Sequence, residues 1–116
     1  MYLNGRGVDK DATEAARLFK SAAALGDGGG QYYLGVMAAN FAGTTHDYPE
    51  ALKWLRLSAA DSLLVNPFQN NAQYALGYMY ANGFGVKKDQ DEALKWFRLA
   101  AQKGNRDAQR ALRTSR

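Results

Sequence analysis

The chain has 116 residues with a net charge of +4, and its length suits a single domain. Hydrophobic residues make up 47% of it, which excludes a disordered segment, and no run approaches the roughly 20 apolar residues of a membrane-spanning helix. Basic residues alternate with acids except near the C-terminus, so the charge disfavours nucleic acid as a partner.

The first residues contain no apolar signal-peptide core, and the chain has no cysteine. We therefore expect a soluble protein. Its compartment stays open, because a cytoplasmic protein and a periplasmic or secreted one whose signal peptide has been removed would both fit this sequence.

A helix pair that is truncated at its start is predicted for residues 1–26. The chain enters it at Met1-Tyr2, which align with Met79-Tyr80, so almost all of the first helix of this unit is missing. The second helix keeps apolar residues that such a helix would cover, namely Leu18, Phe19 and Ala22. We expect this uncovered face to pair with another subunit, as a homo-oligomer, or the chain to be a fragment of a longer array.

Two nearly complete repeats follow, at residues 31–60 and 72–104. They align without gaps at an offset of 42 residues, whereas matches at the two ends of the chain give a basic period of 36. Six extra residues therefore lie within 61–71, which we predict to be an insertion that forms a protruding loop or short helix. Residues 105–116 repeat the beginning of a unit and are predicted to form a capping helix.

Each repeat is predicted to contain two helices. In the third unit Leu76 and Tyr80 share one helical face, and Phe97 lies on the apolar face of the next helix. Second helices begin with an acidic form of the capping box, Asp-x-x-Glu, at Asp11, Asp47 and Asp89. Glycines that adopt a left-handed conformation are expected to end two of them, at Gly26 and Gly104.

The residues of the third unit resemble the Sel-1-like repeat family, which is related to the tetratricopeptide repeats. The matching positions are Ala72, Leu76, Gly77, Tyr80, Gly83, Gly85, Val86, Asp89, Ala93, Trp96, Phe97, Ala100, Ala101 and Gly104. The second unit departs from the pattern at Ala38, where tyrosine is usual, and at residues 41–45. The resemblance implies an all-α fold, a right-handed α-α superhelical solenoid of about three repeats with a C-terminal capping helix, as one domain over residues 1–116.

Tetratricopeptide geometry, carried over through Leu76, Gly77 and Tyr80, implies a concave protein-binding face. Its residues would be Asn4, Tyr32, Val36, Asn40, Asn71, Tyr74, Tyr78, Asn82 and Arg110. The tyrosines suit a peptide-binding surface, but tyrosines at this spacing also pack between repeats. The asparagine ladder Asn4, Asn40 and Asn82 could bind an extended backbone, although asparagine before glycine is also a favourable helix ending.

No catalytic, cofactor-binding or metal-binding residues are predicted. His46 is the only histidine, and we interpret it as an exposed loop residue. Gly83 and Gly85 lack both the preceding strand and the third glycine of a dinucleotide-binding loop. Basic pairs recur on the second helices, and we interpret them as a solvated outer face, with acidic partners or nucleic acid as the alternative: Arg17 and Lys20, Lys53 and Arg56, and Lys95 and Arg98.

These observations, with the resemblance, imply a non-catalytic scaffold or adaptor. It would bind another protein, through a peptide or protein loop on its concave face, without a cofactor. The alternative is a bacterial effector-neutralising (immunity) protein or a host-surface-interaction protein, which the family also includes. An enzyme would need a catalytic constellation that the sequence does not contain.

Overall fold

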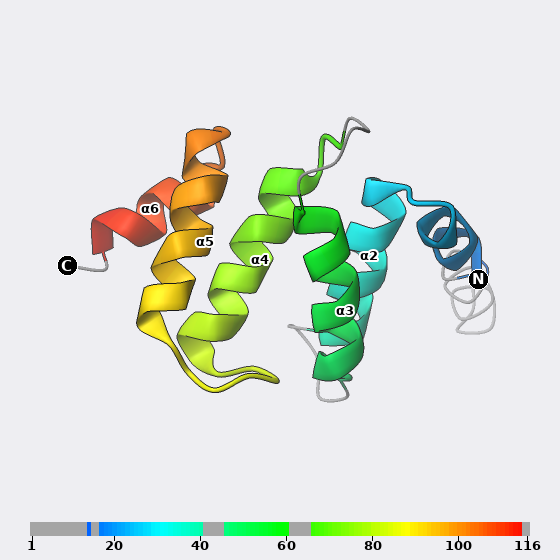
Figure 1. Ribbon diagram of the computed structural model, residues 1–116, viewed down its shortest axis with the longest axis horizontal. Coiled ribbons are helices and arrows are strands. Elements are labelled where there is room, and N and C mark those ends of the chain that lie inside the picture. The colour runs from blue at the N-terminus through cyan, green and yellow to red at the C-terminus, as the bar shows by residue number, and fades with distance from the viewer. Residues whose placement is uncertain (1–13, 15–16, 41–45, 61–65, 115–116) are drawn as a thin grey trace, which may run out of the picture.

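The computed structural model describes residues 14, 17–40, 46–60 and 66–114. Residues 17–24 form a helical segment, and the helices that follow are α2 (Gly28–Ala39), α3 (Tyr48–Ala59), α4 (Gln69–Asn82), α5 (Gln90–Gln102) and α6 (Arg106–Thr114). None of the residues in these described ranges forms a strand. Figure 1 shows the helices arranged in chain order along the longest axis of the molecule, with the segment 17–24 and α6 at opposite ends.

The helices contact their neighbours in the array. α2 pairs with α3 and α4 with α5, while α4 also contacts both helices of the preceding pair and α6 packs on α5. This arrangement confirms the predicted all-α repeat solenoid, in which each repeat is stabilised by the next one along the chain.

Close approach within each pair depends on a glycine of its first helix. A Cβ atom added to Gly35 would lie 2.6 Å from Cγ of Leu55, and one added to Gly77 would lie 2.6 Å from the ring of Phe97. Leu55 and Phe97 are both buried. The glycines therefore leave the space that these large side chains fill, as expected for a closely packed core.

The acidic residues before α3 and α5 cap these helices as predicted. The side chain of Asp47 accepts a hydrogen bond from the backbone N–H of Glu50 at 3.1 Å, and Asp89 accepts one from Glu92 at 3.1 Å. Each carboxylate thus satisfies an amide that has no partner within the helix and complements the helix dipole. Asp11 lies outside the described residues.

The glutamates of these motifs do not complete a reciprocal capping box, and this part of the prediction was wrong. Glu50 accepts a hydrogen bond from the indole N–H of Trp54 at 2.8 Å, and Glu92 accepts one from Trp96 at 3.1 Å. Each pair is separated by four residues, which places both side chains on one helical face. The glutamates therefore orient the tryptophans.

The backbone explains why the glutamates are available for this contact. The N–H of Asp47 donates to the carbonyl of Ala38 at 2.7 Å, and the N–H of Asp89 donates to that of Tyr80 at 3.0 Å. The cap amide is therefore already bonded to the preceding helix. Since the same bond recurs 42 residues apart, Ala38 and Tyr80 occupy equivalent positions in their repeats.

Glutamines join each repeat to the next. Their amide groups donate to a carbonyl near the end of the preceding second helix, at 3.4 Å for Gln31 to Ala23, 3.3 Å for Gln73 to Ala59 and 3.2 Å for Gln109 to Ala101. The first and last bonds span eight residues, whereas the middle one spans fourteen. The six-residue insertion therefore leaves the junction between repeats intact.

The end of the insertion is folded against the array. Residues 61–65 lie outside the described residues, but Asn66 donates to the carbonyl of Ser58 at 2.8 Å and accepts from the N–H of Phe68 at 3.0 Å. The ring of Phe68 stacks on Tyr32 at 5.7 Å. The Asn66 turn leads directly into α4, which begins at Gln69.

Two residues that were expected to be uncovered at the N-terminal end are packed. Phe19 stacks on Tyr33 at 4.9 Å, and Ala22 closely approaches Gly30 of α2. The expectation that Phe19 and Ala22 lack an intramolecular neighbour was wrong, because the first helix of the following repeat covers them. Leu18 is 57% exposed, so the argument for pairing through this face now rests on that residue.

Candidate binding groove

A groove of about 210 Å³ runs between α2 and α4. We call it the tyrosine groove, and its walls are formed by Tyr32, Val36, Asn71, Tyr74, Ala75 and Tyr78. The spacing explains the grouping, because residues three or four apart lie on one face of a helix. α2 contributes two of these residues and α4 contributes the other four.

The tyrosine groove continues towards the C-terminal helix. Tyr74 also borders a second hollow of about 200 Å³, whose other walls are Asp107, Arg110, Ala111 and Thr114 of α6. Asp107 and Arg110 form an exposed ion pair at 3.6 Å on the same face of α6. One tyrosine therefore joins an aromatic hollow to a polar one.

The tyrosines both pack between helices and face the groove. The ring of Tyr74 lies 5.5 Å from that of Phe97 and 6.4 Å from that of Tyr78, measured between centroids. Tyr78 lies 5.8 Å from Phe84 and is 37% exposed. The two interpretations of these residues are therefore compatible, since one part of each ring packs while another part lines the groove.

The environment raises the pKa of two of the phenols. Burial raises the pKa of Tyr32, and the neighbouring Tyr33 raises it further. Burial also raises the pKa of Tyr74, with smaller contributions from Asp107 and Tyr78, while Arg110 lowers it. At neutral pH both hydroxyls can donate as well as accept hydrogen bonds.

The structure brings most of the predicted site residues together. Tyr32, Val36, Asn71, Tyr74 and Tyr78 line the tyrosine groove, and Arg110 lines its continuation. Asn40 and Asn82 instead end α2 and α4. Asn40 adopts a left-handed conformation with φ of 46°, and the amide of Asn82 donates to the carbonyl of Tyr78 at 2.8 Å. Both features favour the interpretation that these asparagines end helices. Asn4 lies outside the described residues.

Comparison with known proteins decides the family. The model of the Sel1 repeat matches residues 1–27, 29–62 and 70–105. The chain belongs to the Sel1 repeat family. A solved Sel1 repeat protein from Oxalobacter formigenes is 37% identical, with a TM-score of 0.62 over 78% of this chain. The aligned region covers 64% of that protein, slightly less than two thirds of its length. Among curated proteins, none matches the chain.

Sel1 repeat proteins generally act as protein-protein interaction scaffolds and are typically non-catalytic. In this member no three histidine, aspartate or glutamate side chains of the described residues gather in a cluster that could hold a metal ion. Nor is any helix of the described part long and apolar enough to cross a membrane.

Sequence reasoning missed some residues that line the tyrosine groove and the hollow beside α6 in this Sel1 repeat chain. Ala75, Ala111 and Thr114 were not predicted, although Ala75 follows Asn71 by four residues and Ala111 follows Asp107 by four. That helical spacing was the signal that could have identified them.

His46 and the basic pairs lie on other surfaces. His46 is exposed and its ring stacks on Tyr48 at 4.1 Å, as expected for a loop residue. All six basic residues of the pairs are exposed. Several contact their own repeats: Lys53 lies over the ring of Trp54 at 4.6 Å, and Lys95 over that of Trp96 at 5.6 Å. These contacts support the interpretation as a solvated outer face.

Proposed function

We propose that this chain is an interaction scaffold that binds an extended peptide or protein loop along the tyrosine groove. The observation that supports the proposal is the grouping of Tyr32, Tyr74 and Tyr78 around one hollow that α2 and α4 form. Tyrosines present a large amphipathic surface at a low cost in conformational entropy, and they are enriched among the residues that dominate binding energies.

The chemistry of the walls indicates what the ligand should carry. An apolar side chain would pack against Val36, Ala75 and the tyrosine rings, while its backbone would bond to the phenols and to Asn71. Towards α6 the ligand would meet Arg110 and Asp107, which offer one cation and one anion. An effector-neutralising or surface-interaction protein would use this same groove with a different partner.

Peptides selected from a displayed random library on the immobilised protein provide the test. Their affinities would be measured by fluorescence anisotropy for the unchanged protein and for Tyr78→Ala. Because Tyr78 is an exposed wall residue, we expect its loss to weaken binding by at least about tenfold, as for a residue that dominates an interface.

Arg98→Ala provides the matched control, because Arg98 is an exposed residue of α5 that borders neither hollow. It should leave the affinities unchanged, and circular dichroism should show that both variants are folded. Equal affinities for Tyr78→Ala and the unchanged protein would contradict the proposal, as would a library from which no peptide is enriched.

A further inference from the structure

A second cleft, of about 750 Å³, lies beside a different face of α2. We call it the Ala38 cleft, and its walls are Arg17, Lys20, Leu34, Met37, Ala38, Asp47, Glu50 and Trp54. Leu34 and Ala38 each follow a residue of the tyrosine groove, Tyr32 and Val36, by two positions. Two positions correspond to about 200° around a helix, so the cleft and the groove are separate.

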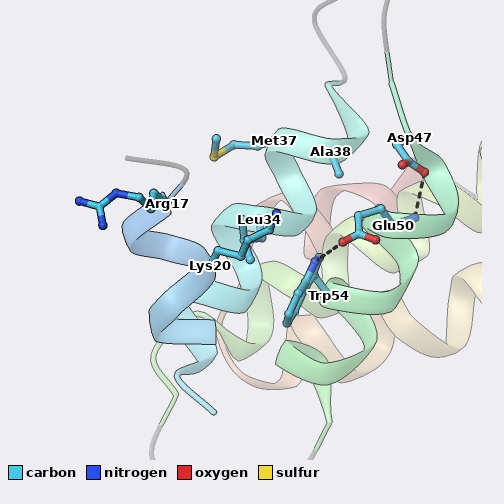
Figure 2. Close-up of a pocket in the computed structure, with 8 residues that line it drawn as sticks. All are labelled: Arg17, Lys20, Leu34, Met37, Ala38, Asp47, Glu50 and Trp54. Carbon is cyan, nitrogen blue, oxygen red and sulfur yellow. Dashed lines mark hydrogen bonds between the residues drawn. The ribbon is translucent and has the colours of Figure 1, made fainter. Parts of the chain in front are cut away.

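Figure 2 shows how three elements form the Ala38 cleft. Arg17 and Lys20 extend from the helical segment 17–24, and α2 presents Met37 and Ala38. On the opposite side α3 carries Trp54, whose indole is held by its hydrogen bond to Glu50. The cleft thus combines an apolar interior, a basic side and an acidic side, and its volume is within the range of about 300–1,000 Å³ for ligand sites.

The next junction of the array shows what fills the equivalent position there. Tyr80 is the equivalent of Ala38, because both carbonyls accept the same cap hydrogen bond. Arg56 is the equivalent of Lys20 on the preceding second helix, 36 residues along the chain. The guanidinium of Arg56 donates to the hydroxyl of Tyr80 at 3.1 Å, so a phenol connects α3 and α4 at this junction.

At the earlier junction, between the segment 17–24 and α2, alanine replaces this tyrosine, and the neighbouring methionine is more exposed. Met37 is 43% exposed, whereas its equivalent Met79 is fully buried. Among the described residues Lys20 forms no ion pair, and the position on α2 that is equivalent to Tyr80 carries alanine instead of a phenol. Within the described part of the chain the cleft therefore keeps an apolar lining and a basic side chain equivalent to Arg56, but it has no phenol at the position of Tyr80.

We propose that the Ala38 cleft binds a tyrosine side chain of another polypeptide, in the position that Tyr80 occupies one repeat later. Leu34, Met37 and Trp54 would pack against the ring, and the ammonium group of Lys20 would donate to the hydroxyl oxygen. Asp47 and Glu50 on the other side disfavour an anionic occupant, which selects a neutral phenol over a carboxylate. The tyrosine groove is not involved, so this site stands or fails independently of the proposed function.

Three small-molecule probes test the proposal by NMR titration of the labelled protein. We expect p-cresol, the tyrosine side chain without its backbone, to shift the amide signals around Ala38 and Lys20. Toluene, which lacks the hydroxyl, should bind more weakly by about tenfold, the value of one charge-assisted hydrogen bond. N-acetyl-tyrosinamide should bind at least as well as p-cresol if the occupant belongs to a polypeptide.

Two variants make the test specific. Ala38→Tyr should fill the cleft with an internal phenol, abolish p-cresol binding and leave the tyrosine groove unchanged. Lys20→Met changes an exposed side chain and should weaken p-cresol about tenfold without affecting toluene. As the matched control, Tyr80→Ala should create a second p-cresol site beside Arg56.

The proposal would be overturned if p-cresol caused no shifts near Ala38, or if toluene bound as tightly as p-cresol. An unchanged p-cresol affinity in Lys20→Met would exclude the role of the ammonium group even if Ala38→Tyr failed to fold. Binding of p-cresol without binding of N-acetyl-tyrosinamide would overturn the polypeptide source.

Discussion

At the scale of single residues, Tyr74 connects packing to recognition. Its ring contacts Phe97 inside the α4-α5 pair, and its other side borders both the tyrosine groove and the hollow beside α6. A side chain held by the core in this way loses little additional conformational entropy when a ligand binds to it. The groove is therefore lined by residues whose positions the fold already determines.

The raised pKa of Tyr74 and of Tyr32 predicts how stability depends on alkaline pH. Tyrosine in the unfolded chain ionises near the ordinary value of 10.0, whereas both folded phenols hold their protons to higher pH. Above that value the folded state binds more protons than the unfolded state, so the free energy of unfolding should fall as pH rises. Below it this contribution is fully present. Urea unfolding across a series of alkaline pH values measures the slope.

Variants show which residues cause the fall in the free energy of unfolding at alkaline pH. Tyr74→Phe removes the ionisable group and should make the alkaline fall in the free energy of unfolding less steep. Asp107→Asn should have a smaller effect in the same direction, because the Asp107 carboxylate raises the pKa of Tyr74 less than burial does. The same alkaline slope in Tyr74→Phe and the unchanged protein would contradict the argument.

At the scale of elements, the helix pair is stabilised by a large side chain that packs against a glycine. In the α4-α5 pair the ring of Phe97 lies over Gly77, and the Ala93 carbonyl would be 3.2 Å from an added Cβ. Alanine favours an isolated helix over glycine by about 1 kcal/mol, but excess volume in a packed core costs about 1–3 kcal/mol. We therefore expect the cost of the excess volume to exceed the gain in helix propensity.

Gly77→Ala should lower the free energy of unfolding by up to about 2 kcal/mol, measured by urea denaturation. The cause can be isolated with Phe97→Leu, which removes the ring that the new methyl group would meet at 2.6 Å. In the double variant the cost of Gly77→Ala should be smaller than in the unchanged background. Equal stability of Gly77→Ala and the unchanged protein would show that the ring moves aside freely.

Sequence patterns predicted these elements well because the physics is local and repeated. Helical spacing identified the pairs, the resemblance to tetratricopeptide geometry implied that Tyr32, Tyr74 and Tyr78 share a concave face, and the structure brings these tyrosines together. Contacts between distant residues were not predictable in the same way. The covering of Phe19 by α2 and the indole bond of Glu92 depend on where the backbone places competing partners. The Ala38 cleft required a comparison of two junctions in space.

At the scale of the whole molecule, the solenoid transmits stability only between neighbours. α6 packs on α5 and has a single fully buried residue, Ala108. Asn105 attaches this helix in two ways. Its side-chain oxygen accepts from the N–H of Ala108 at 2.8 Å, and its amide donates to the side-chain oxygens of Asn70 and Asn71 at 3.1 and 3.2 Å. In addition to its packing on α5, the last helix is therefore attached to the start of α4 through the side chain of Asn105.

Asn105→Ala should consequently loosen one end of the array without affecting the other. Loss of the cap alone is worth about 1 kcal/mol, so amide hydrogen exchange in α6 should accelerate about fivefold or more. Exchange in α2 and α3 should stay unchanged, because repeats contact only their neighbours. Asn105→Asp separates the two contributions: it keeps an acceptor for Ala108 but loses the donor to Asn70, so its α6 should exchange at an intermediate rate. Uniform acceleration of amide exchange along the whole chain would instead show that the array unfolds as a single cooperative unit. In that case every helix of the array, and not only Asn105 and its immediate neighbours, would hold Arg110 in place.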